Sequence, residues 1–580
     1  MKNMSKWMYK TKSAWLKEHE AELAQKFKVN PVILKVLEDR GVKGEDNIRE
    51  YLEADIKKVS DGSELTDMKK GVQIIANAVK SKKRIRIMGD YDVDGVTSTY
   101  VLYCGLKHLG AHCDKFLPHR IEDGYGLHED AIRKAYEDNV EVILTCDNGI
   151  AAAKEILLAK ELGMTVVVTD HHEVPYEEGT DKSRHYILPP ADAVIDPKRQ
   201  EDTGVFKEIC GAVVAWKFMW NLYREFNMED DFHSSDFLEI VSLGTVCDVM
   251  DLLKDNRAIV KEGLKRMKNT SNIGLQALIE ELGMKDKDLK SYDYGFKIGP
   301  CINAEGRLDS ANEAFDLLTE TDIEKAKEKA SAMRALNEER QRLTKEGMEK
   351  AFQIIDETMS DDKVLVVYLP ETHESIAGII AGKVRERYNK PAFVLTKSDK
   401  GFLKGSGRSI PAYSMFEKMN EVKDMMLGFG GHPLAAGLSV EPEKLDALRC
   451  ALNEKSGLTE DDFIQKVMID VILPIDFLTQ KLIKQLEILE PFGKGNEKPI
   501  FAQSNVRATK ADIIGVNKNV LKITFASRNC KSGVCFSNIE EKLELLQEPG
   551  KLYGFKMLYY PTLNEWNNMV SIQANVQDVC

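Results

Sequence analysis

The sequence predicts a multidomain α/β protein with a parallel sheet, a long linker helix, a second α/β lobe and a small C-terminal β-barrel. The chain has 580 residues, too many for one core and enough for about three or four domains. Between about 80 and 260, near-continuous apolar runs alternate with helical segments, as is typical of buried parallel strands. The charged stretch 321–358 contains one glycine and no proline, which indicates a single long helix.

We expect five segments along the chain. Pro31 opens "PVILKVLEDRG" as a helix start within a charged, helical N-terminal segment. Four apolar runs then read as strands: "RIRIMGD", "VEVILTCDNG", "MTVVVTDHH" and "ADAVIDP". After about 462, short strands separated by polar turns fit a small β-barrel. The expected boundaries are 1–75, 76–320, 321–358, 359–457 and 458–580.

Bulk composition indicates a folded, cytoplasmic protein. The chain is 43% hydrophobic and 30% charged, and no run approaches the ~20 apolar residues of a membrane-spanning helix. The ten cysteines include no CxxC pair, so we expect reduced, buried thiols. The net charge of −13 does not itself indicate nucleic-acid binding, but a local basic groove would suffice for it.

The segment "MGDYDVDGVTS" (88–98) places Asp90, Asp92 and Asp94 on alternate positions. Like charges at this spacing repel one another unless a cation lies among them. A calcium-binding EF-hand loop is a poor match, because its twelfth position would be Val101 instead of glutamate. The preceding run also reads as a strand and not as an entering helix. A metal site at the carboxyl edge of a parallel sheet fits better.

Further acids and histidines follow the later apolar runs. Asp147 ends "VILTCD", a DHH triplet ends "VVVTDHH", and Asp248 lies in "SLGTVCDVMD". Each aspartate alone would suit a helix N-cap, but the set is hard to explain that way. If the strands are neighbours, these groups converge and can hold two divalent ions ~3.5–4 Å apart. Carboxylates with imidazole favour Mn²⁺ or Mg²⁺, and such a pair of ions serves phosphoester hydrolysis.

"DHH" at 170–172, with "GDYDVDG" and "CDNG" upstream, resembles the DHH phosphoesterase family. Within that family the chain is similar to the bacterial single-strand-specific DNA exonucleases. The resemblance covers nearly the whole chain in the same order. Further motifs that carry it are "GTVCDVMDLLKDNR" (244–257), "IGPCINAEGRLDSANEA" (298–314), "GSGRSI" (405–410), "GGHPLAAG" (430–437) and "EPFGKGNEKPIF" (490–501).

The resemblance implies a DHH catalytic domain (76–320), a DHH-associated substrate-binding domain (359–457) and an OB-fold nucleic-acid-binding domain (458–580). The implied activity is hydrolysis of single-stranded DNA from the 5′ end with two Mn²⁺ or Mg²⁺ ions. The implied role is DNA repair and recombination. A helicase or a single-strand-binding protein is then a candidate partner, and a membrane is not.

The resemblance also implies roles for the acids and histidines. Asp147 is the expected bridge between the two ions, and Asp90 is a ligand or an immediate neighbour. Asp170 should orient an imidazole, and His172 should face the scissile phosphate. The full set of implied metal ligands is Asp92, Asp94, Asp147, His171 and Asp248.

Substrate-binding residues are expected in the second lobe and just before the linker helix. In "GSGRS" the glycines allow close approach while the polar side chains hold a phosphate, although the segment alone would also suit a flexible turn. His373 falls where the family has a functional histidine, and a surface histidine is the alternative. The candidates are Arg307, Ser406, Arg408, Ser409, His432 and His373.

The expected barrel could add nonspecific contacts to DNA. Residues 494–535 carry eight basic and two acidic residues. Aromatic residues on a basic barrel face can stack on bases, but most aromatic residues at such spacings belong to a core. The candidates are Phe501, Phe525, Phe536, Tyr553, Tyr559 and Trp566.

Two departures from the family pattern keep other functions open. Met88 stands where many members have histidine, and Cys301 stands where the family often has arginine. One alternative is a diverged DHH phosphodiesterase acting on short oligonucleotides or cyclic dinucleotides. Another is a catalytically inactive scaffold related to the family, which the retained acids disfavour.

Overall fold

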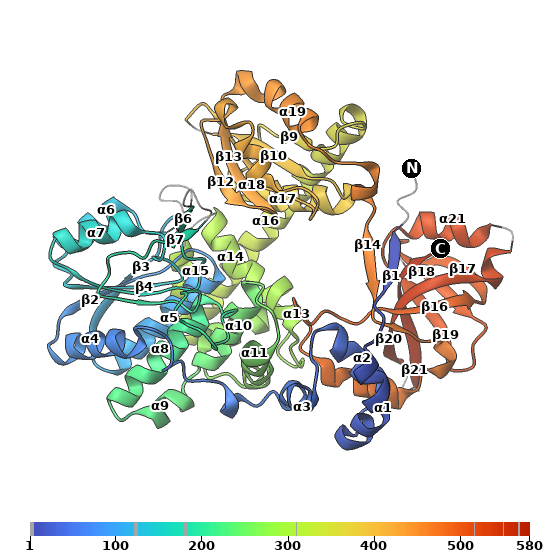
Figure 1. The fold of residues 1–580 in the computed structure, drawn as a ribbon, viewed down its shortest axis with the longest axis horizontal. Coiled ribbons are helices and arrows are strands. Elements are labelled where there is room, and N and C mark those ends of the chain that lie inside the picture. The colour runs from blue at the N-terminus through green and yellow to red at the C-terminus, as the bar shows by residue number, and fades with distance from the viewer. Residues whose placement is uncertain are drawn as a thin grey trace. The chain divides into compact units, whose positions relative to one another are not determined.

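The computed structural model describes residues 5–120, 126–178, 183–308, 310–398, 400–515, 517–548, 550–566 and 569–580 (Figure 1). These residues form two compact units. Unit 1 contains 60–248 and 263–465, and unit 2 contains 5–59, 249–262 and 466–580. Among the described helices, none has the length and apolar character needed to cross a bilayer.

Unit 1 is built around a five-stranded parallel sheet, as expected. Its strands lie in the order β3 (His112–Phe116), β2 (Arg84–Met88), β4 (Val142–Cys146), β5 (Thr165–Thr169) and β8 (Ala193–Ile195). The four apolar runs identified in the sequence supply β2, β4, β5 and β8. The sequence analysis missed β3, because "HCDKF" is a polar, half-exposed edge strand.

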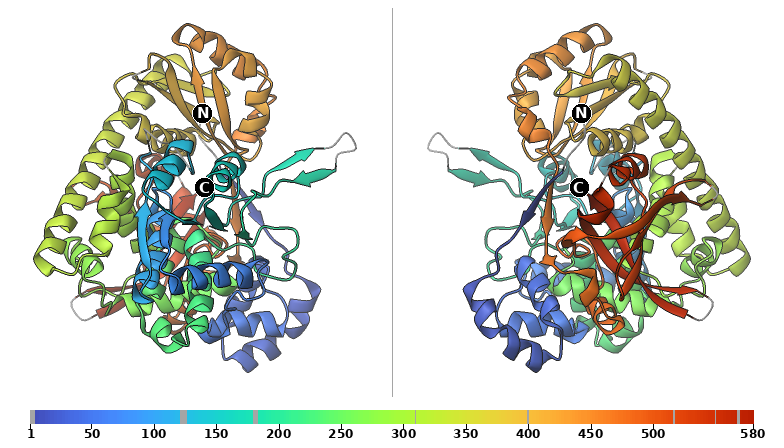
Figure 2. Two further views of the ribbon diagram at one scale, coloured as in Figure 1. Left: turned by 90° about the vertical axis from the view of Figure 1, so that its left-hand side faces the viewer. Right: turned by 90° about the vertical axis from the view of Figure 1, so that its right-hand side faces the viewer.

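Helices cover both faces of this sheet. Figure 1 shows α6 (Glu129–Glu137) and α7 (Ala153–Glu161) on one face, with α4 (Met68–Lys80) and α8 (Gly211–Glu225) on the other. Helix α5 (Val93–His108) follows β2 and packs on α8 and on α10 (Phe237–Cys247). Two short strands, β6 (Tyr176–Glu178) and β7 (Arg184–Tyr186), project from this domain (Figure 2). Because all five strands of the sheet are parallel, their carboxyl ends lie at the same edge.

The linker helix α16 spans Ile323–Thr358. Asp322 caps it by accepting hydrogen bonds from the backbone N–H groups of Glu324 and Lys325. Its buried stripe packs first on α12 (Ile273–Glu281), α14 (Gly299–Leu308) and α15 (Ala311–Leu318), and later on α17 (Glu374–Tyr388). The helix thus connects the two α/β parts of unit 1.

The second lobe of unit 1 contains a mixed five-stranded sheet. Its order is β12 (Gly428–His432), β13 (Ala435–Val440), β11 (Leu403–Arg408), β10 (Ala392–Lys397) and β9 (Leu365–Tyr368). Within the described part of this lobe, β9 and β10 pair in parallel and the other neighbours are antiparallel. Helix α17 packs on β10 and β11, which places the start of α17 beside the "GSGR" segment of β11.

Unit 2 contains a seven-stranded sheet of OB type. Among the described residues no pairing joins its two outer strands, so the structure supports an OB-type sheet without the expected closure into a barrel. Phe501, Phe525 and Tyr559 lie in its core, whereas Phe536 and Tyr553 are exposed. The side chain of Trp566 lies outside the described part. The strand order is β15 (Val471–Ile472), β16 (Phe501–Val506), β20 (Phe555–Trp566), β21 (Met569–Val579), β19 (Cys530–Cys535), β18 (Val520–Phe525) and β17 (Ala508–Ile514).

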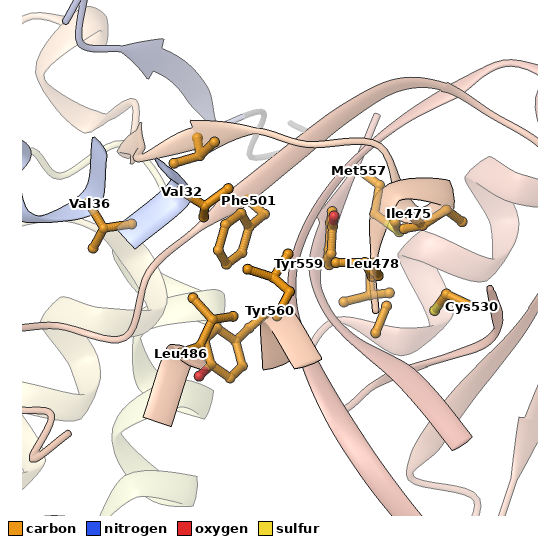
Figure 3. Packing of buried hydrophobic residues seen from close by; sticks show 14 of the residues in the cluster. Val32, Val36, Ile475, Leu478, Leu486, Phe501, Cys530, Met557, Tyr559 and Tyr560 are labelled. Atoms are coloured by element: carbon orange, nitrogen blue, oxygen red, sulfur yellow. The ribbon is translucent and has the colours of Figure 1, made fainter. Parts of the chain in front are cut away.

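The N-terminal helices complete the core of unit 2. Figure 3 shows Val32 and Val36 packed with Phe501, Leu486 and Tyr560. These valines belong to α2 (Pro31–Asp39), which follows α1 (Ala14–Phe27) and precedes α3 (Glu45–Glu53). Not all of the N-terminal segment is helical as expected, because β1 (Lys6–Tyr9) pairs in parallel with β14 (Lys466–Ile469). The first 55 described residues thus share one hydrophobic core with the last segment of the chain.

A buried arginine, Arg257, connects distant segments of unit 2. The guanidinium of Arg257 lies 3.8 Å from the ring centroid of Tyr51. It donates hydrogen bonds to the backbone carbonyls of Tyr51, Ile488 and Leu489 at 2.8–3.1 Å. Because these carbonyls come from the N-terminal helices and from the segment before β16, Arg257 joins three distant parts of the chain.

Substitution in α2 should therefore loosen strands far away in sequence. Ile33 is fully buried in this core, and we expect Ile33→Ala to cost unit 2 about 2–5 kcal/mol of unfolding free energy. Amide hydrogen exchange should accelerate in β16 and β20. The control Ile472→Ala, at a residue 60% exposed, should leave exchange near wild type. Unchanged exchange in both strands of the Ile33→Ala protein would contradict a shared core.

Candidate metal centre

The acidic segment after β2 forms a loop and a helix start instead of an extended strand. Asp92 is the N-cap of α5, and its Oδ1 accepts hydrogen bonds from the backbone N–H groups of Asp94 (2.9 Å) and Gly95 (3.1 Å). Asp94 lies in the first turn of the helix. The alternate positions of these acids in the sequence therefore do not lie along one strand. Helix capping brings them together, since it turns the chain sharply after Asp90.

A second helix start holds Asp94. Its two carboxylate oxygens accept hydrogen bonds from the backbone N–H groups of Gly211 (2.6 Å) and Ala212 (2.9 Å), at the beginning of α8. Partial positive charge at a helix N-terminus favours an ionised carboxylate. Gly211 has no room for a side chain, because a Cβ there would lie 2.7 Å from Cβ of Asp147. The start of α8 thus packs directly against two acids of the cluster.

His171 lies among three carboxylates. Its Nε2 is 3.0 Å from Asp147 Oδ1, 3.6 Å from Asp94 Oδ2 and 3.7 Å from Asp248 Oδ2. Asp147 follows β4 directly, with a left-handed backbone (φ 60°) that turns its side chain into the cluster. Asp248 is the C-cap of helix α10. Unlike Asp147, Asp248 follows a helix and not a strand, but its side chain reaches the same place.

Asp170 fixes both histidines of the DHH triplet. Its Oδ1 accepts hydrogen bonds from the backbone N–H of His171 (2.7 Å) and lies 2.8 Å from Nδ1 of His172. Its Oδ2 accepts a hydrogen bond from the backbone N–H of Ile150 (2.9 Å). Burial opposes ionisation of Asp170, but these hydrogen bonds and the two imidazoles outweigh it and lower its pKa. Asp170 therefore serves as a fixed acceptor that orients His172.

The ligand atoms fall into three overlapping groups. In each group all the ligand atoms lie within 4.8 Å of one another. Asp147 and His171 each belong to two of the groups; the two oxygens of Asp147 could bridge neighbouring ions, whereas one imidazole nitrogen could bind only one of them. The groups are Asp147 with His171 and His172, Asp94 with His171 and Asp248, and Asp90 with Asp92 and Asp147.

The electrostatics of the cluster match a bound cation. Burial and mutual repulsion raise the pKa values of Asp90, Asp92 and Asp147. Asp90 Oδ1 is buried and has no hydrogen-bond partner within the described residues. Burial lowers the pKa of His171, which favours the neutral imidazole that metals bind. The donor set of carboxylates with imidazole suits Mn²⁺ and also accommodates Mg²⁺.

A positively charged cleft lies in the same unit. Its volume is 510 Å³, and its walls come from α14, α17, β11 and the residue Arg120. Burial and the neighbouring guanidinium groups of Arg120, Arg340 and Arg408 lower the pKa of Arg307 to about 9. Burial and nearby arginines likewise lower the pKa of Arg408. Cations packed this closely favour an anionic ligand such as phosphate.

Only some of the expected substrate-binding residues line this cleft. Arg307, Ser406 and Arg408 do. Ser409 is buried, and its hydroxyl donates a hydrogen bond to the backbone carbonyl of Tyr413 (2.6 Å). His373 is the N-cap of α17, where its Nδ1 lies 2.7 Å from Ser375 Oγ. His432 is exposed at the end of β12. None of these last three residues is among those that line the cleft.

The cleft also contains residues that the sequence analysis missed. Arg120 and Lys404 line it beside Arg408. Arg120 follows β3, the edge strand that the sequence analysis missed. Recognising β3 in the sequence would have placed Arg120 at the same edge of the sheet as the acids. Gly378 in α17 lets the helix approach β11, because a Cβ there would lie 2.8 Å from Ser406 Oγ and 3.1 Å from Arg408 Nη2.

Neither Met88 nor Cys301, the two departures from the family pattern, belongs to the three groups of ligand atoms. Met88 is fully buried in the hydrophobic core on one face of the sheet. Cys301 is buried against α16, where it accepts a hydrogen bond from Asn337 Nδ2 at 3.4 Å. Met88 therefore leaves the carboxylate set intact, and Cys301 is bonded within the fold.

Three family models match the chain in order: the DHH family N-terminal domain at 84–245, the DHHA1 domain at 361–456 and the RecJ OB domain at 469–578. The single-stranded-DNA-specific exonuclease RecJ of Bacillus subtilis (strain 168) is 33% identical over 559 residues, which cover 96% of this chain and 69% of the relative. The chain belongs to the RecJ family.

Other members of the RecJ family agree in sequence and in fold. The single-stranded-DNA-specific exonuclease RecJ of Escherichia coli (strain K12) is 31% identical over 493 residues, covering 81% of this chain and 83% of the relative. The crystal structure of RecJ in complex with Mn²⁺ from Thermus thermophilus matches with a TM-score of 0.84 and 25% identity. That match covers 100% of this chain and 80% of the Thermus chain.

Metal binding by this RecJ-family chain should depend on pH. Because folding raises the pKa values of Asp90 and Asp147, the metal-free protein should lose stability as pH rises through those values. Cations must displace the bound protons, so the stabilisation by Mn²⁺ should be larger at about pH 8 than at about pH 6. Thermal unfolding in EDTA and in Mn²⁺ measures both effects.

The isosteric variant Asp147→Asn provides the matched control. It removes one repelling charge, so its metal-free stability should depend less on pH and its stabilisation by Mn²⁺ should be smaller. A stabilisation by Mn²⁺ that is equal at both pH values in the wild-type protein would contradict the assignment.

Proposed function

We propose that this chain is an exonuclease that hydrolyses phosphodiester bonds of single-stranded DNA from the 5′ end towards the 3′ end. One observation carries the proposal: the segment that contains Asp90 and Asp92 lies next to the positively charged cleft. The guanidinium of Arg120 lies 4.9 Å from the ring centroid of Tyr91, which stands between Asp90 and Asp92. A phosphate in the cleft would therefore lie near a metal-binding loop. The names of the RecJ relatives support DNA as the substrate.

The acid–histidine cluster is the proposed catalytic centre. When bound there, two Mn²⁺ or Mg²⁺ ions would supply positive charge to the phosphate and lower the pKa of a bound water for attack. Asp147 is the proposed shared ligand because it belongs to two of the ligand groups. Asp90 is a proposed ligand or close neighbour, since its free oxygen is buried beside Asp92. The proposed ligand set is Asp92, Asp94, Asp147, His171 and Asp248.

His172 is the proposed contact to the scissile phosphate. Its Nδ1 lies 2.8 Å from Asp170 Oδ1, so Nε2 is the ring nitrogen that would face a phosphate. Burial disfavours the imidazolium, but the hydrogen bond to Asp170 and the surrounding acids outweigh it and raise the pKa of His172 to about 9. A protonated His172 can donate a hydrogen bond to a phosphate oxygen or to the leaving oxygen. Asp170 acts through His172 by holding its orientation.

The cleft is the proposed site for the phosphate of the strand end. Arg307, Ser406 and Arg408 supply donors from α14 and β11. Ser409 acts indirectly, because its hydrogen bond to the Tyr413 carbonyl holds the chain after β11. His432 and His373 are proposed contacts to the strand outside the cleft.

The remaining parts of the chain fit the same activity. We propose the DHH catalytic domain at 76–320, the linker helix at 321–358, the DHH-associated domain at 359–457 and the OB-fold domain at 458–580, with 1–75 as the N-terminal segment. The match to the RecJ OB domain supports a role for the C-terminal sheet in holding single-stranded DNA. A DNA substrate places the proposed activity in the cytoplasm, in repair and recombination, with a helicase or a single-strand-binding protein as partners.

A time course with Mn²⁺ tests the activity and its polarity together. One long single-stranded DNA carries a label at the 5′ end in one sample and at the 3′ end in another. We expect immediate release of 5′-labelled mononucleotide and a ladder of shortening 3′-labelled strands. Asp147→Ala should abolish both while the protein stays folded, since the proposed shared ligand is lost. Cleavage of dinucleotides or cyclic dinucleotides with long strands left intact would favour the small-substrate alternative.

The proposed phosphate track predicts a change in salt dependence. Arg408→Ala should weaken binding of single-stranded DNA and reduce the slope of log K against log salt by about 0.7, the value for one lost phosphate contact. Binding titrations at several salt concentrations measure the slope. Arg449→Ala is the control, because Arg449 pairs with Asp362 away from the cleft. An unchanged slope for Arg408→Ala would remove this residue from the track.

A further inference from the structure

Two stacked aromatic rings stand exposed beside the helix that ends at Asp248. Tyr292 lies in α13 (Ser291–Asp293), and Phe296 lies in the π-helical turn η2 (Tyr294–Ile298). Their ring centroids are 4.7 Å apart, with an interplanar angle of 20°. The residues are 60% and 68% exposed, the highest values among the described tyrosine, phenylalanine and tryptophan residues of unit 1. We call Tyr292 and Phe296 the aromatic pair.

Tyr294, the residue midway between the two rings in sequence, packs against α10, the helix that ends at Asp248 of the candidate metal centre. Tyr294 is fully buried, and its hydroxyl accepts a hydrogen bond from Ser242 Oγ of α10 (3.4 Å). Cys247 Sγ at the end of α10 contacts the Tyr294 carbonyl at 3.6 Å. A Cβ at Gly299 would lie 2.4 Å from Cys247 Sγ, so α14 begins in close contact with the end of α10. Since Asp248 caps α10, the aromatic pair and this acid share one rigid support.

The local chemistry favours a ligand over a purely structural role. Large apolar side chains so exposed cost free energy without contributing to a core, and such patches mark binding sites. Single π-helical turns within α-helices are also frequent at functional sites. Lys297 Nζ lies 6.0 Å from the ring centroid of Tyr292 and pairs with Asp293, which brings a cation to the edge of the pair. An aromatic face with an adjacent ammonium group suits a nucleotide, because one binds the base and the other attracts the phosphate.

We propose that the aromatic pair is a base-stacking site for the part of the DNA strand that lies outside the metal centre. This inference rests on the proposed function and adds a substrate subsite to it. Every base presents a π-face, so stacking here would hold the strand without selecting its sequence. The rigid support from α10 would fix the distance between a stacked base and the proposed metal ligand Asp248.

The size of the pair favours bases over a protein partner. Two aromatic side chains offer at most ~300–500 Å² of contact area. A stable protein interface buries ~800 Å² on each partner, so the pair alone is too small for one. Two rings match one or two stacked bases.

The double variant Tyr292→Ala/Phe296→Ala tests the proposal. Single-stranded DNA with one 2-aminopurine, placed at successive positions from the 5′ end, is titrated with wild-type protein in EDTA so that cleavage does not interfere. We expect quenching at one or two adjacent positions in the interior of the strand. The double variant should lose quenching there and bind on the order of tenfold or more weakly. Cleavage of a dinucleotide, which has no strand extending beyond the metal centre, should remain unchanged.

Three further proteins separate stacking from general damage. Tyr136→Ala removes another exposed aromatic residue of unit 1, in α6, and should bind DNA as wild type does. Phe296→Trp keeps a stacking ring and should retain the quenching, whereas Phe296→Leu keeps apolar area without a ring and should weaken it. Thermal unfolding checks that each variant is folded.

Two results would overturn the proposal. One is equal quenching and affinity for the double variant and for Tyr136→Ala. The other is a change in the molar mass in solution of the double variant, which would assign the pair to contact between copies of the chain. Failure of the proposed function is distinguishable, because the wild-type protein would then cleave no labelled strand whatever the binding data show.

Discussion

Repulsion among buried carboxylates is the constraint around which the catalytic part of unit 1 is organised. Asp92 and Asp94 are held by the backbone N–H groups of two different helix starts, and Asp170 is held by the N–H of Ile150. These bonds fix the side chains but leave too little positive charge to ionise every acid, as the raised pKa of Asp147 shows. The fold therefore maintains a site whose carboxylates must bind either protons or metal cations.

The cleft has an excess of positive charge, whereas the metal centre has an excess of negative charge. Burial and neighbouring guanidinium groups lower the pKa values of Arg307 and Arg408, and this cluster of cations favours an anion. Tyr91 connects the two regions, since its ring lies beside Arg120 and its neighbours are acids of the cluster. A phosphodiester accompanied by divalent cations meets both requirements at once. This complementarity links the electrostatics of the fold to phosphoester chemistry.

Much of this arrangement could be predicted from the sequence, because buried parallel strands carry long apolar runs and their acids stand at the strand ends. The DHH segment and Asp147 belong to this class. The geometry around Asp92 and Asp248 could not be predicted in this way, since it depends on helix caps that alternation does not reveal. Arg120 was missed because the strand before it is polar and lies at the sheet edge. The positions of Ser409 and His432 relative to the cleft depend on turns whose direction only the tertiary structure sets.

The composition of unit 2 has a consequence for synthesis of the protein. Its core combines α1, α2 and α3 with strands that end at Val579, and almost all of unit 1 is encoded between them. The apolar faces of residues 5–59 therefore emerge from the ribosome long before their partners exist, and they stay uncovered while the parallel sheet and its helices are made. The contacts between the N-terminal helices and the C-terminal strands must wait until those strands have been made, because closure of so long a loop precedes them. The N-terminal helices thus remain without their C-terminal packing partners throughout the synthesis of unit 1.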